Sequence, residues 1–218
     1  MRLSEKTITG LKLLLFLAGL LPLAYLVSGA FFFPQWLGPN PAEAITRSTG
    51  DWTLRLLLAT LTVTPWRRLS GWISLLRFRR MLGLFAFFYG LLHVSSYVSF
   101  DHVFDVGEIV KDIIKRPFIT VGFLCLVLMI PLAATSTNGM VRRLGAKRWQ
   151  ALHRLIYVIA PLGVLHFWWM VKRDLTEPII YGVLLAILLG VRLYFRKRDP
   201  VGRGPRAGVG KPSAQQSR

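Results

Sequence analysis

The chain has 218 residues, of which 53% are hydrophobic, and it carries a formal net charge of +18. A charge of this size can indicate nucleic-acid binding, but no nucleic-acid-binding module is visible in the sequence. The single cysteine, Cys125, excludes an internal disulfide and a CxxC redox motif. The basic residues instead flank long apolar segments, which indicates a membrane protein rather than a soluble domain.

Six apolar segments are long enough, or nearly so, to cross a hydrocarbon core of about 30 Å, which requires about 20 helical residues. The first resembles a signal peptide in its basic start, but it is longer than the apolar core of about 7–15 residues typical of such peptides. The second is the shortest and contains Arg55. We therefore predict an all-α integral membrane protein, a six-transmembrane-helix bundle over residues 1–198, followed by a disordered basic tail over 199–218. The predicted spans are residues 11–33, 52–65, 81–100, 118–134, 152–170 and 178–194.

Successive predicted loops alternate in their content of basic residues. They concentrate before the first span, between the second and third, between the fourth and fifth, and after the sixth. The intervening loops instead carry both signs; the third has Asp101, Asp105, Glu108 and Asp112 against Lys111, Lys115 and Arg116. This positive-inside pattern places both termini in the cytoplasm, with the basic residues beside anionic lipid head groups.

Three of the four histidines lie within predicted spans, where an ionisable side chain is costly and indicates a functional site. These are His93, His153 and His166; the fourth, His102, follows the third span and is expected to be a solvated loop residue. The alternative for each intramembrane histidine is a hydrogen bond between helices. Three such residues on two helices favour a ligand site, because neutral imidazole is a good ligand for iron.

The depths of the histidines predict which of them share a site. His93 lies eight residues before Asp101 and His166 six before Lys172, which puts them about 12 Å and about 9 Å from the same end of parallel helices. They could therefore ligate one iron near the outer face. His153 lies 13 residues before His166, or about 20 Å along a straight helix, and so belongs near the cytoplasmic face. On that helix the two side chains point about 140° apart, unless Pro161 bends it.

Two imidazoles leave a bare metal ion undercoordinated, whereas haem supplies four equatorial nitrogens and needs only two axial ligands. We therefore predict that His93 and His166 are axial ligands of one haem iron. His153 is predicted to serve a second cofactor site nearer the cytoplasmic face. Haem propionates require cations, and basic residues cluster at the inner edge of the same helices, where positive-inside charge also accounts for them. They are Arg77, Arg79, Arg80, Lys147, Arg148 and Arg154.

The sequence resembles the bacterial MsrQ family, formerly YedZ, over residues 10–197. Three segments carry the resemblance: RFRRMLGLFAFFYGLLHVSSYV (77–98), KRPFITVGFLCLVLMIPLAATS (115–136) and WQALHRLIYVIAPLGVLHFWW (149–169). The segment GDWTLRLLLATLTVTPWRRL (50–69) is similar to the family's second helix.

The resemblance implies a ferric-reductase-like fold in the bacterial inner membrane that binds haem b and FMN. It implies electron transfer from the quinone pool, or from a cytosolic flavin reductase, to a periplasmic molybdopterin enzyme, MsrP. That partner reduces methionine sulfoxide in oxidised envelope proteins. His93, His153 and His166 match the family's histidine positions.

One position departs from two-haem relatives of the wider superfamily, which have a second histidine on the third helix. Arg79 and Arg80 stand there in this chain. The inner site therefore has an unusual second ligand, holds a five-coordinate haem, or holds no haem at all. FMN is a further occupant, since arginines bind phosphate well.

Two other functions are compatible with six spans. A free-standing ferric or quinone reductase would need no periplasmic partner, and no Gly-rich nucleotide-binding loop for NADPH or FAD is visible. A small proton or metal transporter is disfavoured by the absence of an inverted repeat and by the scarcity of intramembrane carboxylates.

Overall fold

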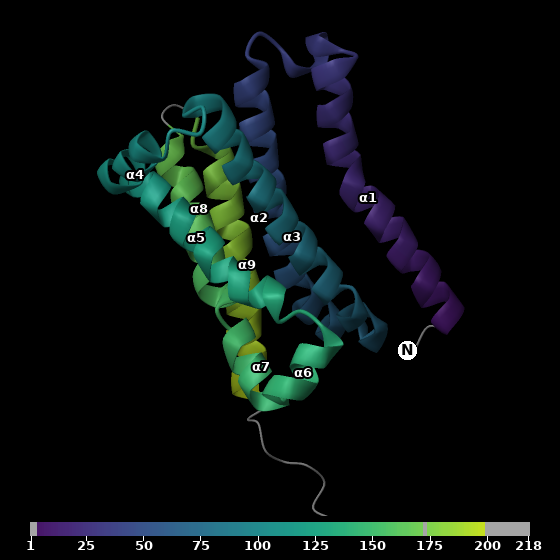
Figure 1. Cartoon of the computed structure of the whole chain (residues 1–218). Helices are drawn as coiled ribbons and strands as arrows, with labels where there is room; N and C mark the ends of the chain where they lie inside the picture. The colour runs from purple at the N-terminus through teal and green to yellow at the C-terminus, as the bar shows by residue number, and fades with distance from the viewer. Residues whose placement is uncertain (1–3, 172–173, 199–218) are drawn as a thin grey trace, which may run out of the picture.

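The computed structural model describes residues 4–171 and 174–198. Every regular element within these residues is helical, which confirms the predicted all-α class. The predicted tail over 199–218 lies outside the described residues. Figure 1 shows the long helices running beside one another, with the short ones at the two ends. The long helices are α1 (Glu5–Phe31), α2 (Pro41–Ser70), α3 (Arg79–Ser96), α5 (Pro117–Ala134), α8 (Ile156–Met170) and α9 (Thr176–Arg198). The short elements are η1 (Pro34–Leu37), η2 (Ile73–Arg77), η3 (Tyr97–Asp101), α4 (Val106–Lys115), α6 (Asn138–Leu144) and α7 (Ala146–His153).

Five helical stretches of the described chain are long and apolar enough to cross a membrane, so the protein is a multi-pass membrane protein. The predicted second span, 52–65, lies inside α2, which has 30 residues and is therefore about 45 Å long. Its charged residues and threonines make α2 too polar to qualify by composition. The five stretches are Glu5–Phe31, Ile73–Asp101, Pro117–Ala134, Ala146–Met170 and Thr176–Phe195.

Arg55, the charged residue inside the predicted second span, is paired within the bundle. Arg55 Nε donates a hydrogen bond to the Tyr181 hydroxyl of α9 at 2.8 Å. A terminal nitrogen of the same guanidinium lies 3.9 Å from the Asp51 carboxylate, and its carbon lies 5.3 Å from the centre of the Trp52 ring. Because a charge within a membrane span is costly unless it is paired, these contacts explain how a span-length helix keeps an arginine.

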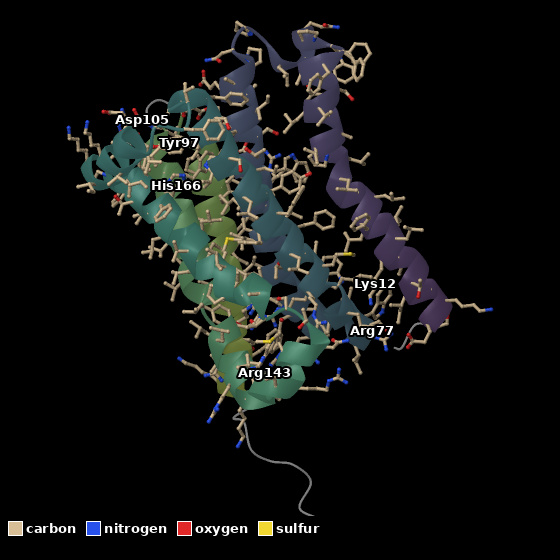
Figure 2. The ribbon with its side chains drawn as sticks, viewed as in Figure 1. Lys12, Arg77, Tyr97, Asp105, Arg143 and His166 are labelled. Carbon is tan, nitrogen blue, oxygen red and sulfur yellow. The ribbon has the colours of Figure 1, made fainter. Side chains whose placement is uncertain are left out.

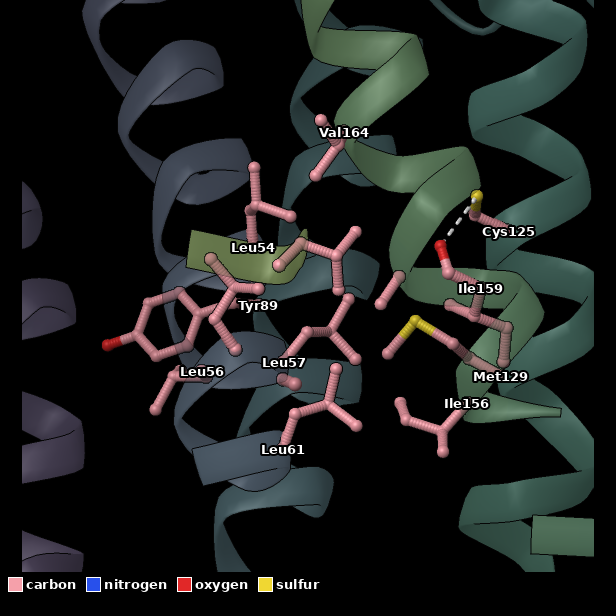
Figure 3. Close-up of a cluster of buried hydrophobic side chains, with 14 of the residues drawn as sticks. Leu54, Leu56, Leu57, Leu61, Tyr89, Cys125, Met129, Ile156, Ile159 and Val164 are labelled. Atoms are coloured by element: carbon pink, nitrogen blue, oxygen red, sulfur yellow. Dashed lines mark hydrogen bonds between the residues drawn. The ribbon is translucent and has the colours of Figure 1, made fainter. Parts of the chain in front are cut away.

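The apolar core lies between α2, α3, α5, α8 and α9 (Figure 3). Leu61, Tyr89 and Ile159 are completely buried there. Cys125, the free cysteine, is also buried, with its sulfur 3.7 Å from the Ile159 carbonyl oxygen. This layer separates the two histidine sites described below.

The Tyr89 hydroxyl of α3 links α1 to the rest of the bundle. It donates to the Gly19 carbonyl at 2.8 Å and accepts from the Leu23 amide at 3.1 Å. These two groups would otherwise bond each other in a regular helix, so the hydroxyl is inserted into the α1 backbone. Pro22, which has no amide hydrogen, precedes Leu23 and further weakens the helical bonding at this point.

The predicted span 152–170 is interrupted. Helix α7 ends at His153 and α8 begins at Ile156. The amides of Arg154 and Leu155 bond three residues back, to Ala151 and Leu152, which is 3₁₀ geometry. Pro161, which could bend this helix, lies within α8, which is unbroken there. The 3₁₀ bonds at 154–155 change the angle between the His153 and His166 side chains from its value on a regular α-helix.

Basic side chains predominate at one end of the bundle (Figure 2), whereas at the other end Lys111 and Arg116 are paired with Glu108 and Asp112. Lys12, Arg77 and Arg143 lie towards one end, together with the start of α1 and the helices α6 and α7. Asp105 lies at the opposite end, beside α4. This distribution matches the loop charges from which the orientation was predicted.

Candidate cofactor site

His93 of α3 and His166 of α8 face each other near the end of the bundle that carries α4. Their ring centres are 6.2 Å apart and the ring planes are inclined by 74°. Two imidazoles bound to opposite sides of one metal atom, with metal–nitrogen bonds of about 2 Å, would have ring centres roughly 6 Å apart. The structure thus brings together the two histidines that the depth argument paired.

Backbone carbonyls orient both rings. His93 Nδ1 lies 2.9 Å from the Thr46 carbonyl oxygen of α2, and His166 Nδ1 lies 2.6 Å from that of Phe118 in α5. A carbonyl can only accept, so each Nδ1 carries the hydrogen and each Nε2 keeps its lone pair. Ligating histidines are commonly held in this way, and both Nε2 atoms are therefore suited to bind a metal.

Two glycines allow the rings to approach neighbouring helices. A Cβ at Gly122 would lie 2.7 Å from Cε1 and 2.8 Å from Nδ1 of His166. A Cβ at Gly50 would lie 3.1 Å from the same two atoms of His93. Sequence reasoning missed both glycines, because an isolated glycine in an apolar helix does not show what approaches it.

Two cavities flank the histidine pair and share part of their lining: His93, Val94, Gly122, His166 and Met170. The cavity on the α2 side reaches Leu57 and Met129 in the core. The cavity on the α4 and α5 side, which includes Ile109 and Ile113, is called the outer cavity because it lies at the end predicted to face outward. Each has an arginine in its lining, Arg47 on the α2 side and Arg116 at the α4–α5 junction. Neither arginine was among the predicted partners of propionates.

The described residues contain no cluster of three or more His, Cys, Asp or Glu side chains that could hold a metal ion. Two facing imidazoles are therefore suited to a metal that brings its own equatorial ligands, and the cavities beside them have mostly apolar linings. These residues fit haem, which His93 and His166 would hold.

His153 lies in a separate cavity, called the inner cavity, towards the basic end. Its ring stacks on Trp149 with 3.8 Å between ring centres, and its Nδ1 lies 3.0 Å from the Trp149 carbonyl oxygen. Nε2 lies 3.4 Å from the Ser136 hydroxyl oxygen, which is 2.7 Å from the Leu132 carbonyl oxygen. Since a hydroxyl has one hydrogen, a bond to Leu132 leaves the His153 Nε2 lone pair available.

Arg79 and Arg80 line this inner cavity at the position where a second histidine would stand. Arg80 also donates to the Asn138 side-chain oxygen at 2.6 Å. No other histidine lines the cavity among the described residues, so His153 has no imidazole opposite it. The cavity combines an aromatic wall, one imidazole and two guanidinium groups.

The expectation that His102 is a solvated loop residue was wrong. Its side chain is only 15% exposed and its Nε2 lies 3.2 Å from the Asp112 carboxylate. Asp112 also accepts from the Tyr97 hydroxyl and from Arg116 Nε, both at 2.8 Å. His102 is brought inward because α3 ends in a π-helical turn and the chain then reverses through Val103 and Phe104, which have φ of 45° and 64°.

Helix α4 is amphipathic and covers the outer cavity. Ile109 and Ile113 line that cavity, whereas Val110 and Ile114 on the neighbouring face are exposed. On the polar face, a 2.6 Å contact with Glu108 raises the pKa of Lys111. The side of α4 that carries Ile109, Asp112 and Ile113 therefore covers the histidine pair at this end of the bundle.

Comparisons with known proteins agree with this geometry. Residues 49–164 match the family described as ferric reductase like transmembrane component. Three similar proteins are named protein-methionine-sulfoxide reductase heme-binding subunit MsrQ. The one from Herminiimonas arsenicoxydans is 59% identical over 88% of each chain. That from Ralstonia nicotianae is 52% identical over 95% of this chain and 93% of its own. That from Bordetella pertussis is 51% identical over 90% of this chain and 96% of its own.

Proposed function

The chain belongs to the MsrQ family of ferric-reductase-like transmembrane proteins, and from this premise we propose that it is the haem-binding electron-transfer subunit of a methionine-sulfoxide reductase system. One observation carries the proposal. His93 and His166 face each other at 6.2 Å with both Nδ1 atoms bonded to backbone carbonyls. This arrangement presents two Nε2 lone pairs to one metal atom.

The residues around this pair have separable roles. Thr46 and Phe118 hold the imidazoles in the ligating tautomer through their carbonyl oxygens. Haem b bound there would supply one-electron chemistry. Leu54, Leu57 and Met129 line the core side of the cavity, where they exclude water and thereby tune the reduction potential.

We propose that electrons enter the protein at the inner cavity. Its Trp149 face and His153 Nε2 suit a flat redox-active ring, and Arg79 and Arg80 suit a phosphate or carboxylate. A second haem with His153 as one axial ligand, FMN and a quinone all meet these requirements. The donor is then the quinone pool or a cytosolic flavin reductase.

The proposed orientation has six spans, with α2 as the second. Both termini are cytoplasmic, and the end that carries His93 and His166 faces the periplasm of an inner-membrane protein. This follows from the basic loops at the opposite end. The contacts of Arg55 support α2 as a span, because Tyr181 gives the guanidinium a hydrogen-bond partner and Asp51 lies 3.9 Å from it.

The acceptor is proposed to be a periplasmic molybdopterin reductase of the MsrP type, so that the pair repairs oxidised methionines. The chain itself would then transform no substrate. A free-standing ferric or quinone reductase on the same fold is the alternative, and it predicts turnover without a periplasmic protein.

Re-oxidation of the purified, reduced protein distinguishes these functions. We expect a reduced haem spectrum that persists when methionine sulfoxide is added alone and is lost rapidly when the cognate periplasmic reductase is also present. Rapid oxidation by the sulfoxide alone would identify this chain as the reductase. A colourless purified protein would support a transporter and exclude an electron carrier.

A further inference from the structure

The outer cavity contains a basic residue whose position is fixed by a buried carboxylate. Asp112 is 8% exposed and accepts hydrogen bonds from Tyr97 and Arg116. It also lies 3.2 Å from His102 Nε2. A buried carboxylate with several donors is held firmly. Of these partners, Tyr97 and Arg116 also line the cavity beside His93 and His166.

The contact between Arg116 and Asp112 leaves the guanidinium fork available. It uses Nε, with a distance of 2.8 Å to Asp112 Oδ1. The two terminal nitrogens, which bind carboxylates and phosphates in bidentate fashion, have no hydrogen bond within the described residues. Arg47, in the lining of the other cavity, differs because its terminal nitrogen is already 2.7 Å from Glu43.

The backbone also fixes Arg116. Its amide donates to the Asp112 carbonyl at 3.0 Å, and its extended conformation is the one favoured before Pro117. Arg116 is the residue that precedes α5, so the amides of the first turn of that helix add positive potential at the same place. The guanidinium of Arg116, its fixed backbone and the start of α5 therefore all favour an anion at this edge of the outer cavity, called the outer rim.

We propose that Arg116, with Asp112 as its positioning residue, binds a carboxylate of the ligand held between His93 and His166. The inference rests on the proposed function, since haem carries two propionate carboxylates. It assigns the anion-binding role to the outer rim, rather than to the basic loops at the other end of the bundle.

The experiment compares Arg116→Gln with Lys115→Gln, which removes the same charge from the neighbouring exposed residue. Haem affinity and the reduction potential of the low-spin haem are measured in purified, detergent-solubilised full-length protein. We expect Arg116→Gln to weaken haem binding roughly tenfold or more, because a charged hydrogen bond is lost. The potential should fall, since removing a nearby cation favours the more positively charged oxidised state. Lys115→Gln should change neither quantity appreciably.

Haem dimethyl ester, whose carboxylates are blocked, tests the contact directly. Esterification should weaken binding to the unmodified protein and cost much less in Arg116→Gln, because the partner is already absent. An equal cost in both proteins would overturn the role of Arg116. Arg116→Lys retains the charge and should restore most of the potential, which keeps the test decisive if the glutamine variant does not fold.

Asp112→Asn tests the positioning role. If Asp112 acts through Arg116, the double variant should bind haem no more weakly than Arg116→Gln alone. If the losses of haem affinity add in the double variant, Asp112 does not act through Arg116 and only stabilises the fold. An unmodified protein without low-spin haem would refute the proposed function itself. A protein with normal haem in which Arg116→Gln behaves like Lys115→Gln would refute only this inference.

Discussion

Gly122→Ala tests whether the close approach of α5 to His166 matters for ligand binding. The added methyl group would lie 2.7 Å from Cε1, whereas ordinary contact begins at 3.4 Å, so the ring must move by 0.7 Å. It cannot move easily, because Nδ1 is bound to the Phe118 carbonyl one turn earlier on the same helix. Overpacking of this kind costs about 1–3 kcal/mol. We therefore expect haem affinity to fall roughly 5- to 150-fold.

The assay is haem titration of the purified protein, followed by its low-spin absorption and electron paramagnetic resonance signals. Gly190→Ala is the matched control, because no atom lies within 4 Å of its added Cβ and both variants gain the same helix propensity of about 1 kcal/mol. Gly50→Ala should fall between them, since its methyl group would lie 3.1 Å from His93. Equal haem affinities and spectra for Gly122→Ala and Gly190→Ala would contradict the role of His166 as a ligand of the haem iron.

The remaining predictions concern the histidines and the orientation. His93→Ala and His166→Ala should each abolish the same low-spin haem signal, with the double variant no worse, because both serve one iron; matched losses in His93→Ala and His153→Ala, with His166→Ala silent, would place the haem at the inner level. His153→Ala should leave that signal intact and slow reduction from the cytoplasmic side, as measured by stopped-flow absorption. A green fluorescent protein fused to the C-terminus should fluoresce, and an active alkaline phosphatase there would invert the proposed topology. His102→Ala should lower the free energy of unfolding by about 1–2 kcal/mol through its lost contact with Asp112, whereas Lys111→Ala on the exposed face should cost less than about 0.5 kcal/mol; equal thermal stabilities would contradict this.

The sequence predicted the pairing of His93 with His166 because depth in a membrane helix depends only on the rise per residue and the loop position. It did not predict the glycine contacts, since they depend on which helices become neighbours. The interruption at Arg154–Leu155 also has no Gly or Pro to indicate it, whereas Pro161 is tolerated in α8 at the loss of a single backbone bond.

Polar side chains near span ends were the other source of error. Asp112 and His102 were read as loop residues because sequence places charged groups in water by default. Their burial follows from the reversal of the chain after α3, which depends on left-handed backbone at two non-glycine residues. Such conformations are sterically uncommon and are not predicted from residue type.

The polarity of α2 has a consequence for how the protein enters the membrane. A charged residue costs up to about 2.5–3.5 kcal/mol during insertion at the centre of a helix and less towards its ends. Arg55 lies near one end of the span 52–65, so it weakens the insertion of α2 by part of that amount. The phenol that accepts the hydrogen bond from Arg55 belongs to Tyr181 of α9, which is synthesised more than 100 residues after α2. Until α9 emerges, this guanidinium must be accommodated by Asp51, lipid head groups or water. Truncation before residue 176 is therefore expected to leave α2 poorly integrated, although both outer histidines are already present in the nascent chain. Since α2 also supplies the Thr46 carbonyl that orients His93, we expect cofactor acquisition to be delayed until α9 has been synthesised and has packed against α2.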